Sequence, residues 1–152
     1  KEVCRRYRIP LIINDAVDIA KEIGADGVHV GLSDMEITKA RTMLGADAII
    51  GASAHNVAEA LAAQEAGADY IGCGAVFTTE TKTDVTALAH RELSAICHAV
   101  RIPAVAIGGI TPENLPRLNG SGIAGVAVIR ALFAQSDIAA AARQLRTLAD
   151  RL

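Results

Sequence analysis

Two aspartates in this sequence could together hold a divalent cation, because each one follows an apolar run that reads as a strand. Asp15, with Asn14 before it, ends the run 10–14, and Asp34 lies three residues beyond the run 27–31. Mg²⁺ usually takes one or two protein carboxylates and completes its shell with water and phosphate oxygens. The alternative interpretation is that each aspartate only caps the helix that follows it.

A polar loop after the apolar run 70–76 has the composition of an oxyanion site. It contains hydroxyl groups, a carboxylate and a lysine, at Thr79, Glu80, Thr81 and Lys82. Such side chains, together with the backbone N–H groups of a tight loop, suit a phosphate. A solvated polar turn would have the same composition, so the loop alone leaves both interpretations open.

A second candidate phosphate site lies toward the end of the chain. Gly109 closes the run 104–108, and Ile129 and Arg130 stand at the end of the run 125–129. Glycine lets the backbone approach a ligand closely, and the start of the following helix offers unpaired N–H groups. A tight turn needed only for packing is the alternative.

These residues need a scaffold that gathers the ends of several strands, and the pattern of the chain predicts one. A β-branched run, a short loop and an Ala-rich helix repeat six times. Strands are expected at 10–14, 27–31, 48–53, 70–76, 104–108 and 125–129. Helices are expected at 17–23, 35–44, 57–66, 91–100, 112–119 and 138–152. The repeated junction Gly-Ala-Asp, at 24–26, 45–47 and 67–69, precedes three of the strands.

Alternating strands and helices indicate an α/β chain with a parallel sheet. Polar residues follow nearly every strand, whereas an open doubly wound sheet concentrates its site at one switch point. The pattern therefore favours a (β/α)₈ TIM barrel, whose site is collected from all the loops that follow the strands. About six of the eight βα units are present, in one domain over residues 1–152.

The missing units are expected at the N-terminal side. Residues 2–7 read as the tail of a helix, and a barrel of this kind typically needs about 250 residues, against 152 here. We therefore expect the chain to lack the first strand-helix-strand region. Open sheet edges favour association, so a homo-oligomer is a candidate state.

Composition excludes several classes of partner. The net charge is −2, no basic run occurs and aromatic residues are few, which argues against a nucleic-acid surface. No apolar run approaches the length needed to cross a bilayer. The cysteines lack metal-binding spacing and indicate thiols in a reducing cytoplasm; they are Cys4, Cys73 and Cys97.

Two other features need an interpretation of their own. The string 120–125 spells G-x-G-x-x-G, but it ends a helix and leads into a strand, which is the reverse of a dinucleotide-binding fingerprint. His29 lies between Val28 and Val30 in a strand, so alternation turns its side chain away from theirs, toward the barrel interior. A satisfied core histidine is the alternative.

Six segments resemble the motifs of the thiamine-phosphate synthase family and occur in that family's order. They are 10–15, 24–31, 50–53, 67–72, 79–82 and 106–110. Several are generic barrel phrases, whereas Ile-Asn-Asp at 13–15 and Thr-Glu-Thr-Lys at 79–82 are specific. The resemblance implies a transferase that joins a pyrimidine methyl diphosphate to a thiazole phosphate, giving thiamine phosphate and pyrophosphate.

The resemblance also assigns residues to roles. Asp15 and Asp34 would hold Mg²⁺ on the diphosphate. The pyrimidine diphosphate would be contacted by Asn14 and by the catalytic residues Ser53 and Lys82. The thiazole phosphate would be lined by Thr79, Glu80, Thr81, Gly109 and Ile129.

Two departures from the family pattern bear on these assignments. The family's Gln-x-Arg-x-Lys pattern, which contacts the pyrimidine diphosphate, belongs to the region that is absent here. Arg130 stands where the family usually has a small serine that contacts phosphate. Its guanidinium could replace that contact, but we expect the side chain to turn away and its backbone N–H to face the phosphate.

The family mechanism is dissociative: the diphosphate leaves, a pyrimidine-methyl cation forms, and the thiazole nitrogen attacks it. Charge neutralisation by metal and lysine suits such a reaction, which needs no protein nucleophile. A thiazole tautomerase of the same superfamily is one alternative, although it needs neither the carboxylate pair nor the Thr-x-Thr-Lys motif. A non-catalytic phosphate-binding remnant of a barrel is the other.

Overall fold

The computed structural model describes residues 1–31, 36–77 and 88–152. Its six strands form one parallel sheet in sequence order. The strands are β1 (Ile12–Asn14), β2 (Gly27–Val30), β3 (Ile49–Ala54), β4 (Tyr70–Gly74), β5 (Ala104–Ile107) and β6 (Gly125–Ala127). The helices are α1 (Glu2–Tyr7), α2 (Val17–Ile23), α3 (Ile37–Leu44), α4 (Val57–Glu65), α5 (His90–Ala99), α6 (Arg130–Phe133) and α7 (Ile138–Ala149), with a 3₁₀ helix, η1 (Leu115–Leu118).

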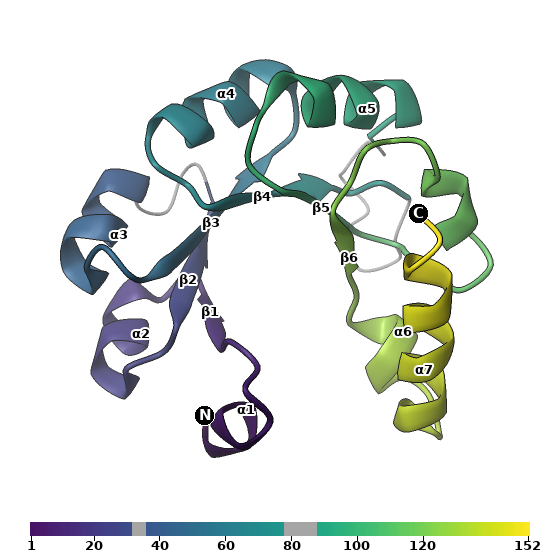
Figure 1. Ribbon diagram of the computed structural model, residues 1–152, viewed down its shortest axis with the longest axis horizontal. Helices are drawn as coiled ribbons and strands as arrows, with labels where there is room; N and C mark the ends of the chain where they lie inside the picture. Colours follow the sequence, from purple (N-terminus) through teal and green to yellow (C-terminus); the bar gives the residue numbers. More distant parts are fainter. Residues whose placement is uncertain (32–35, 78–87) are drawn as a thin grey trace.

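The sheet curves into an open arc, with β1 and β6 at its two ends and helices α2 to α5 outside it (Figure 1). The prediction of a parallel α/β chain is therefore confirmed, and the six strands form a half-barrel. None of the helices in the described ranges is long and apolar enough to cross a membrane.

The core lies between the convex face of the sheet and the helices. Side chains of alternate strand residues, among them Val28, Ile50 and Ile71, are completely buried there. On the helical side, Leu93 and Ile96 of α5 are also completely buried. Burial of each such side chain contributes about 1.5–3 kcal/mol to the free energy of folding, compared with leaving it exposed to water. The remaining residues of each strand, between the buried ones, point to the concave face of the arc.

Two of the Gly-Ala-Asp junctions have the same structure. The Oδ2 atom of Asp26 accepts the backbone N–H of Leu11 at 2.7 Å, and the N–H of Asp26 donates to the carbonyl of Leu11 at 3.0 Å. Asp69 makes the same pair of bonds with Ile50, both at 2.7 Å. In each case the aspartate ties the entry of one strand to the neighbouring strand before it.

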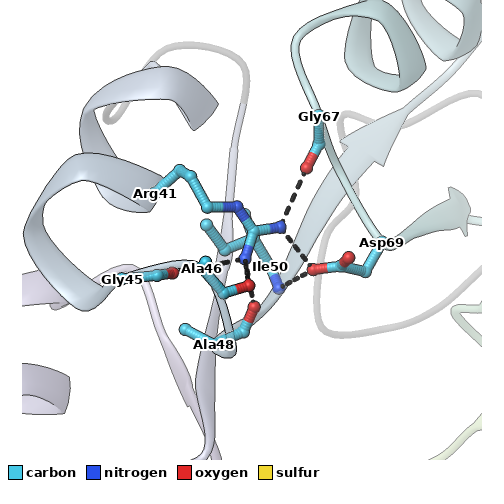
Figure 2. A network of polar contacts seen from close by, with 7 residues as sticks. All are labelled: Arg41, Gly45, Ala46, Ala48, Ile50, Gly67 and Asp69. Carbon is cyan, nitrogen blue, oxygen red and sulfur yellow. Dashed lines mark hydrogen bonds and ion pairs between the residues drawn. The ribbon is translucent and has the colours of Figure 1, made fainter.

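The middle Gly-Ala-Asp junction, at 45–47, has a different structure from the other two. Ala48 is an additional residue between Asp47 and β3, so this aspartate lies one position earlier relative to its strand than Asp26 and Asp69 do. Gly45 has a positive φ of 96°, but its ψ of 176° is not that of a left-handed helical residue. Arg41 of α3 reaches in instead, and Figure 2 shows its guanidinium among backbone carbonyls. The guanidinium donates to the carbonyls of Gly45, Ala46, Ala48 and Gly67 and to the carboxylate of Asp69.

The predicted helix 112–119 is wrong in type, because only the 3₁₀ turn η1 forms there. Pro116 has no N–H to give to an α-helical bond. The side chain of Asn114 bonds the backbone of the preceding loop instead. The predicted strand 125–129 ends early, at Ala127, because Arg130 already begins α6.

Candidate active site

The predicted site residues that the structure describes lie at one edge of the sheet. All strands are parallel, so their C-terminal ends share an edge. Asn14 ends β1, Ser53 lies near the end of β3, Gly109 follows β5 and Ile129 follows β6. The other predicted site residues lie outside the described ranges, and their roles stay predictions: Asp34, Thr79, Glu80, Thr81 and Lys82.

The Asn14-Asp15 pair forms a tight polar corner after β1. Asp15 adopts a left-handed backbone, with φ of 66°, which is uncommon for a residue other than glycine. The Asn14 Nδ2 atom donates to Oδ2 of Asp15 at 2.6 Å, and the N–H of Asp15 donates to the carbonyl of His29 at 2.8 Å. The N-cap of α2 is Ala16, one residue later, so Asp15 does not occupy the capping position.

His29 lies on the concave face, as strand alternation predicts, with Val28 and Val30 fully buried on the other face. Its Nδ1 atom is 3.0 Å from the hydroxyl of Tyr70, and its Nε2 atom is 3.2 Å from the hydroxyl of Ser53. Burial lowers the pKa of His29, while the charge of Asp15 acts in the opposite direction. A largely neutral ring therefore links three strands across the face of the half-barrel.

Two glycines make room for the His29 ring. Residues 29, 51 and 70 are register partners on β2, β3 and β4, so all three point to the same face. A Cβ atom at Gly51 would lie 2.1 Å from Cζ of Tyr70 and 2.5 Å from Nδ1 of His29. At Gly72, a Cβ atom would lie 2.9 Å from Cε1 of His29. Both contacts are too short for any larger residue to be accommodated without moving the ring.

Sequence reasoning missed Tyr70 as a member of this cluster. The signal was present, because Tyr70 is a large polar aromatic residue opposite Gly51 in a chain with two tyrosines. Pairing it with His29, however, requires knowing the register of three strands. Ser53 was identified only by its resemblance to a family motif.

The glycine turn after β5 is fixed by hydrogen bonds to the side chain of Asn114. Gly108 and Gly109 both have positive φ, at 99° and 65°. Asn114 donates from Nδ2 to the carbonyl of Gly109 at 2.8 Å, while its Oδ1 accepts the N–H of Thr111 at 2.8 Å. Asn114 is thus a second residue that sequence reasoning missed, and it fixes the path of the backbone at the predicted phosphate cradle.

The end of β6 presents an exposed corner. Ile129 is 69% exposed and is the N-cap residue of α6, whose first residue is Arg130. Because Arg130 is helical, the strand alternation that would have oriented its side chain does not extend to it. The orientation predicted for the guanidinium stays a prediction.

A magnesium site would draw on the carboxylate of Asp15. Across the described ranges, no group of three or more His, Cys, Asp or Glu residues is arranged to hold a metal. Mg²⁺ does not require such a cluster, since one or two carboxylates and the oxygens of a bound phosphate suffice. The hard oxygen ligand at the C-terminal edge fits that ion.

Comparisons with known proteins agree with one another. The family model described as "Thiamine monophosphate synthase" matches residues 1–132. A thiamine-phosphate synthase of Methanobrevibacter smithii is 54% identical over 133 residues, which are 88% of this chain and 64% of that protein. One from Clostridium botulinum (strain Eklund 17B / Type B) is 47% identical over 152 residues, covering 100% of this chain and 71% of that protein.

A solved structure agrees as well. Thiamine phosphate pyrophosphorylase from Pyrococcus furiosus superposes with a TM-score of 0.89 at 38% identity, covering 98% of this chain and 71% of that chain. The present chain thus spans about two thirds of the length of these relatives, between 64% and 71%.

Proposed function

The chain belongs to the thiamine monophosphate synthase family, and from this membership we propose that it acts as a transferase. The reaction joins a hydroxymethylpyrimidine diphosphate to a thiazole phosphate and gives thiamine phosphate and pyrophosphate. The observation that carries the proposal is the shared C-terminal edge of the sheet in a fold that matches the Pyrococcus enzyme. At this edge, Asn14 and Asp15 lie at the end of β1, Ser53 near the end of β3 and Gly109 after β5.

The proposed division of labour follows the chemistry of each corner. Asp15, with Asp34, would hold Mg²⁺, which supplies neutralisation of the diphosphate charge. Asn14, Ser53 and Lys82 bind and orient the pyrimidine diphosphate. The polar loop and the glycine turn bind the thiazole phosphate, through Thr79, Glu80, Thr81, Gly109, Ile129 and the backbone of Arg130.

The described residues support a dissociative substitution. The bond from the pyrimidine methyl carbon to the diphosphate oxygen breaks first, and the electron pair leaves with the diphosphate. The thiazole nitrogen then supplies the pair for the new carbon–nitrogen bond. Burial lowers the pKa of His29 and raises that of Tyr70, so the imidazole ring and the phenol are both uncharged. The chain's part is to position both substrates and stabilise the departing charge.

Three broader features belong to the same proposal. We place the six units in an eight-unit (β/α)₈ barrel, because the sheet already curves into an arc (Figure 1). The three cysteines are free thiols, which suits a reducing cytoplasm. The tautomerase alternative is not favoured, because the relatives at about half identity carry synthase names.

The test is formation of thiamine phosphate from the two substrates with Mg²⁺, followed by chromatography of the product. Lys82→Ala should lower turnover on the order of 10²-fold or more, because a positive charge near a leaving diphosphate acts mainly in the transition state. Wild-type turnover in this variant would reject the role of Lys82. Binding of both substrates without any product would instead favour the non-catalytic alternative.

A further inference from the structure

The polar cluster of Tyr70, His29 and Ser53 on the concave face has an order of hydrogen-bond donors and acceptors that the family resemblance does not supply. Its members form a chain from Tyr70 through the ring of His29 to Ser53, with separations of 3.0 Å and 3.2 Å. Tyr70 and His29 are half-buried, and Ser53 is partly exposed at the edge where ligands would bind. The function of this hydrogen-bonded series depends on which of its atoms carry the hydrogens.

The Tyr70 hydroxyl sets the direction. Among the residues that the structure describes, its hydrogen-bond partner is the His29 ring. Burial raises the pKa of the phenol, so the hydroxyl keeps its hydrogen. If the phenol accepted from a ring N–H instead, its own hydrogen would have no partner among the described residues. The phenol therefore donates to the bare ring nitrogen Nδ1, and the other ring nitrogen, Nε2, carries the N–H.

We propose that Tyr70 is a positioning residue that fixes His29 in the Nε2–H tautomer, so that the Ser53 hydroxyl accepts from His29 and presents its own hydrogen to the substrate. In the opposite tautomer, the Ser53 hydroxyl would donate inward to Nε2 and offer the ligand only a lone pair. The proposal therefore assigns the ligand atom at Ser53 as a hydrogen-bond acceptor, such as a phosphate oxygen or an aromatic ring nitrogen.

Gly51 is the second part of this device. It lies between His29 and Tyr70 in the register, and a Cβ atom there would fall 2.1 Å from Cζ of Tyr70. The two rings, whose centroids are 5.4 Å apart, can therefore meet across β3 because position 51 has no side chain. The identity of the ligand rests on the proposed function, whereas the tautomer does not.

The first experiment measures the tautomer in the ligand-free chain. Two-bond ¹H–¹⁵N spectra of the labelled protein distinguish a bare Nδ1 from a bare Nε2. We expect His29 as the Nε2–H form in the wild type and a shift toward the other form in Tyr70→Phe. The matched control is Tyr7→Phe, since Tyr7 is 64% exposed on α1 and should leave the spectrum unchanged. A bare Nε2 in the wild type would overturn the proposal.

The second experiment measures coupling to Ser53 in the thiamine phosphate assay. Tyr70→Phe should lower kcat/KM about two- to tenfold, the range that one hydrogen bond supports. The same change should have no further effect in a Ser53→Ala background, because Tyr70 acts through Ser53. Equal losses in both backgrounds would overturn the positioning role. A protein that makes no product would reject the proposed function, and the tautomer spectrum would still decide the inference.

Discussion

Both edges of the sheet carry polar residues, but these residues have different roles at the two edges. At the N-terminal edge, the Arg41 guanidinium and the Asp69 carboxylate bond each other and the surrounding backbone (Figure 2). At the C-terminal edge, Asp15 is held in a left-handed backbone and Ser53 is partly exposed beside His29. The polar groups of the first arrangement bond mainly to the fold itself, whereas those of the second lie partly exposed at the edge where we propose that ligands bind.

This difference predicts which substitutions should lower stability and which should lower activity. Polar groups that are satisfied inside the fold cost stability when one partner is removed, because the other partner is left unpaired. Polar groups that are directed outward cost little stability when they are changed, but they determine ligand binding. Substitutions at the two edges should therefore affect different measurements.

The largest expected effect is at the C-terminal edge, in Asp15→Asn. Turnover should fall on the order of 10²-fold or more, because the change removes a charge proposed to hold Mg²⁺ at the diphosphate. Folding should be nearly unchanged, since asparagine tolerates the left-handed backbone that residue 15 adopts. Steady-state kinetics over a range of Mg²⁺ concentrations and thermal denaturation measure the two quantities.

The matched control is Asp18→Asn, at an exposed aspartate in the first turn of α2. It removes the same charge three residues away and should leave turnover unchanged. Equal losses in the two variants would mean that general charge near α2, and not a ligand at residue 15, explains the effect.

Arg41→Met is expected to be the largest loss at the other edge. The free energy of unfolding should fall by about 2–3 kcal/mol, because several carbonyls and the Asp69 carboxylate lose their donor together. Substrate affinity should not change. Urea denaturation measures the loss, and Arg146→Met is the control, since the exposed Arg146–Asp150 pair is worth only about 0.3–0.5 kcal/mol. A similar loss in both variants would remove the special role of Arg41.

The two equivalent aspartate junctions provide a finer test. Asp26→Ala should cost about 1 kcal/mol, because it removes one acceptor from the N–H of Leu11. Asp69→Ala should cost more, because Arg41 loses its counter-charge at 2.7 Å as well. In an Arg41→Met background the two aspartate changes should cost about the same. A difference that persists there would locate the cause elsewhere than in the ion pair.

The smallest effect on turnover is expected at Asn56, a residue of the C-terminal edge that we expect to serve only the fold. Asn56 caps α4 by accepting the N–H of Glu59 at 2.9 Å, and Asn56→Ala should lower the free energy of unfolding by about 1 kcal/mol without affecting turnover. A large loss of turnover would instead place Asn56 in the site.

Glu59 gives this cap a pH dependence. Partial burial opposes its charged form, but hydrogen bonds from His55 and Asn56 outweigh it and lower the pKa of Glu59 below 4.5. A lowered pKa in the folded state stabilises the protein above about pH 4.5, and this contribution is lost as the pH falls through the folded value. The difference in stability between the wild type and Glu59→Gln should shrink accordingly in acid denaturation curves.

The sequence by itself determined the parts of the protein that depend on local patterns. β-branched runs and Ala-rich segments indicated six strands, each followed by a helix, and the structure contains all six strands, with an α-helix after each of them except β5. Alternation alone turned His29 away from Val28 and Val30. The pattern failed at 112–119, where the ring of Pro116 and the side chain of Asn114 override helix propensity.

The tertiary structure decided which residues meet. The Tyr70–His29–Ser53 chain joins three strands and depends on register, which no local pattern encodes. The same holds for Arg41, whose role arises because Ala48 displaces one junction by a single residue. Strand and helix formation follow from the spacing of neighbours along the chain, whereas these hydrogen bonds form between residues 19 to 41 positions apart, which only the packed sheet brings within reach.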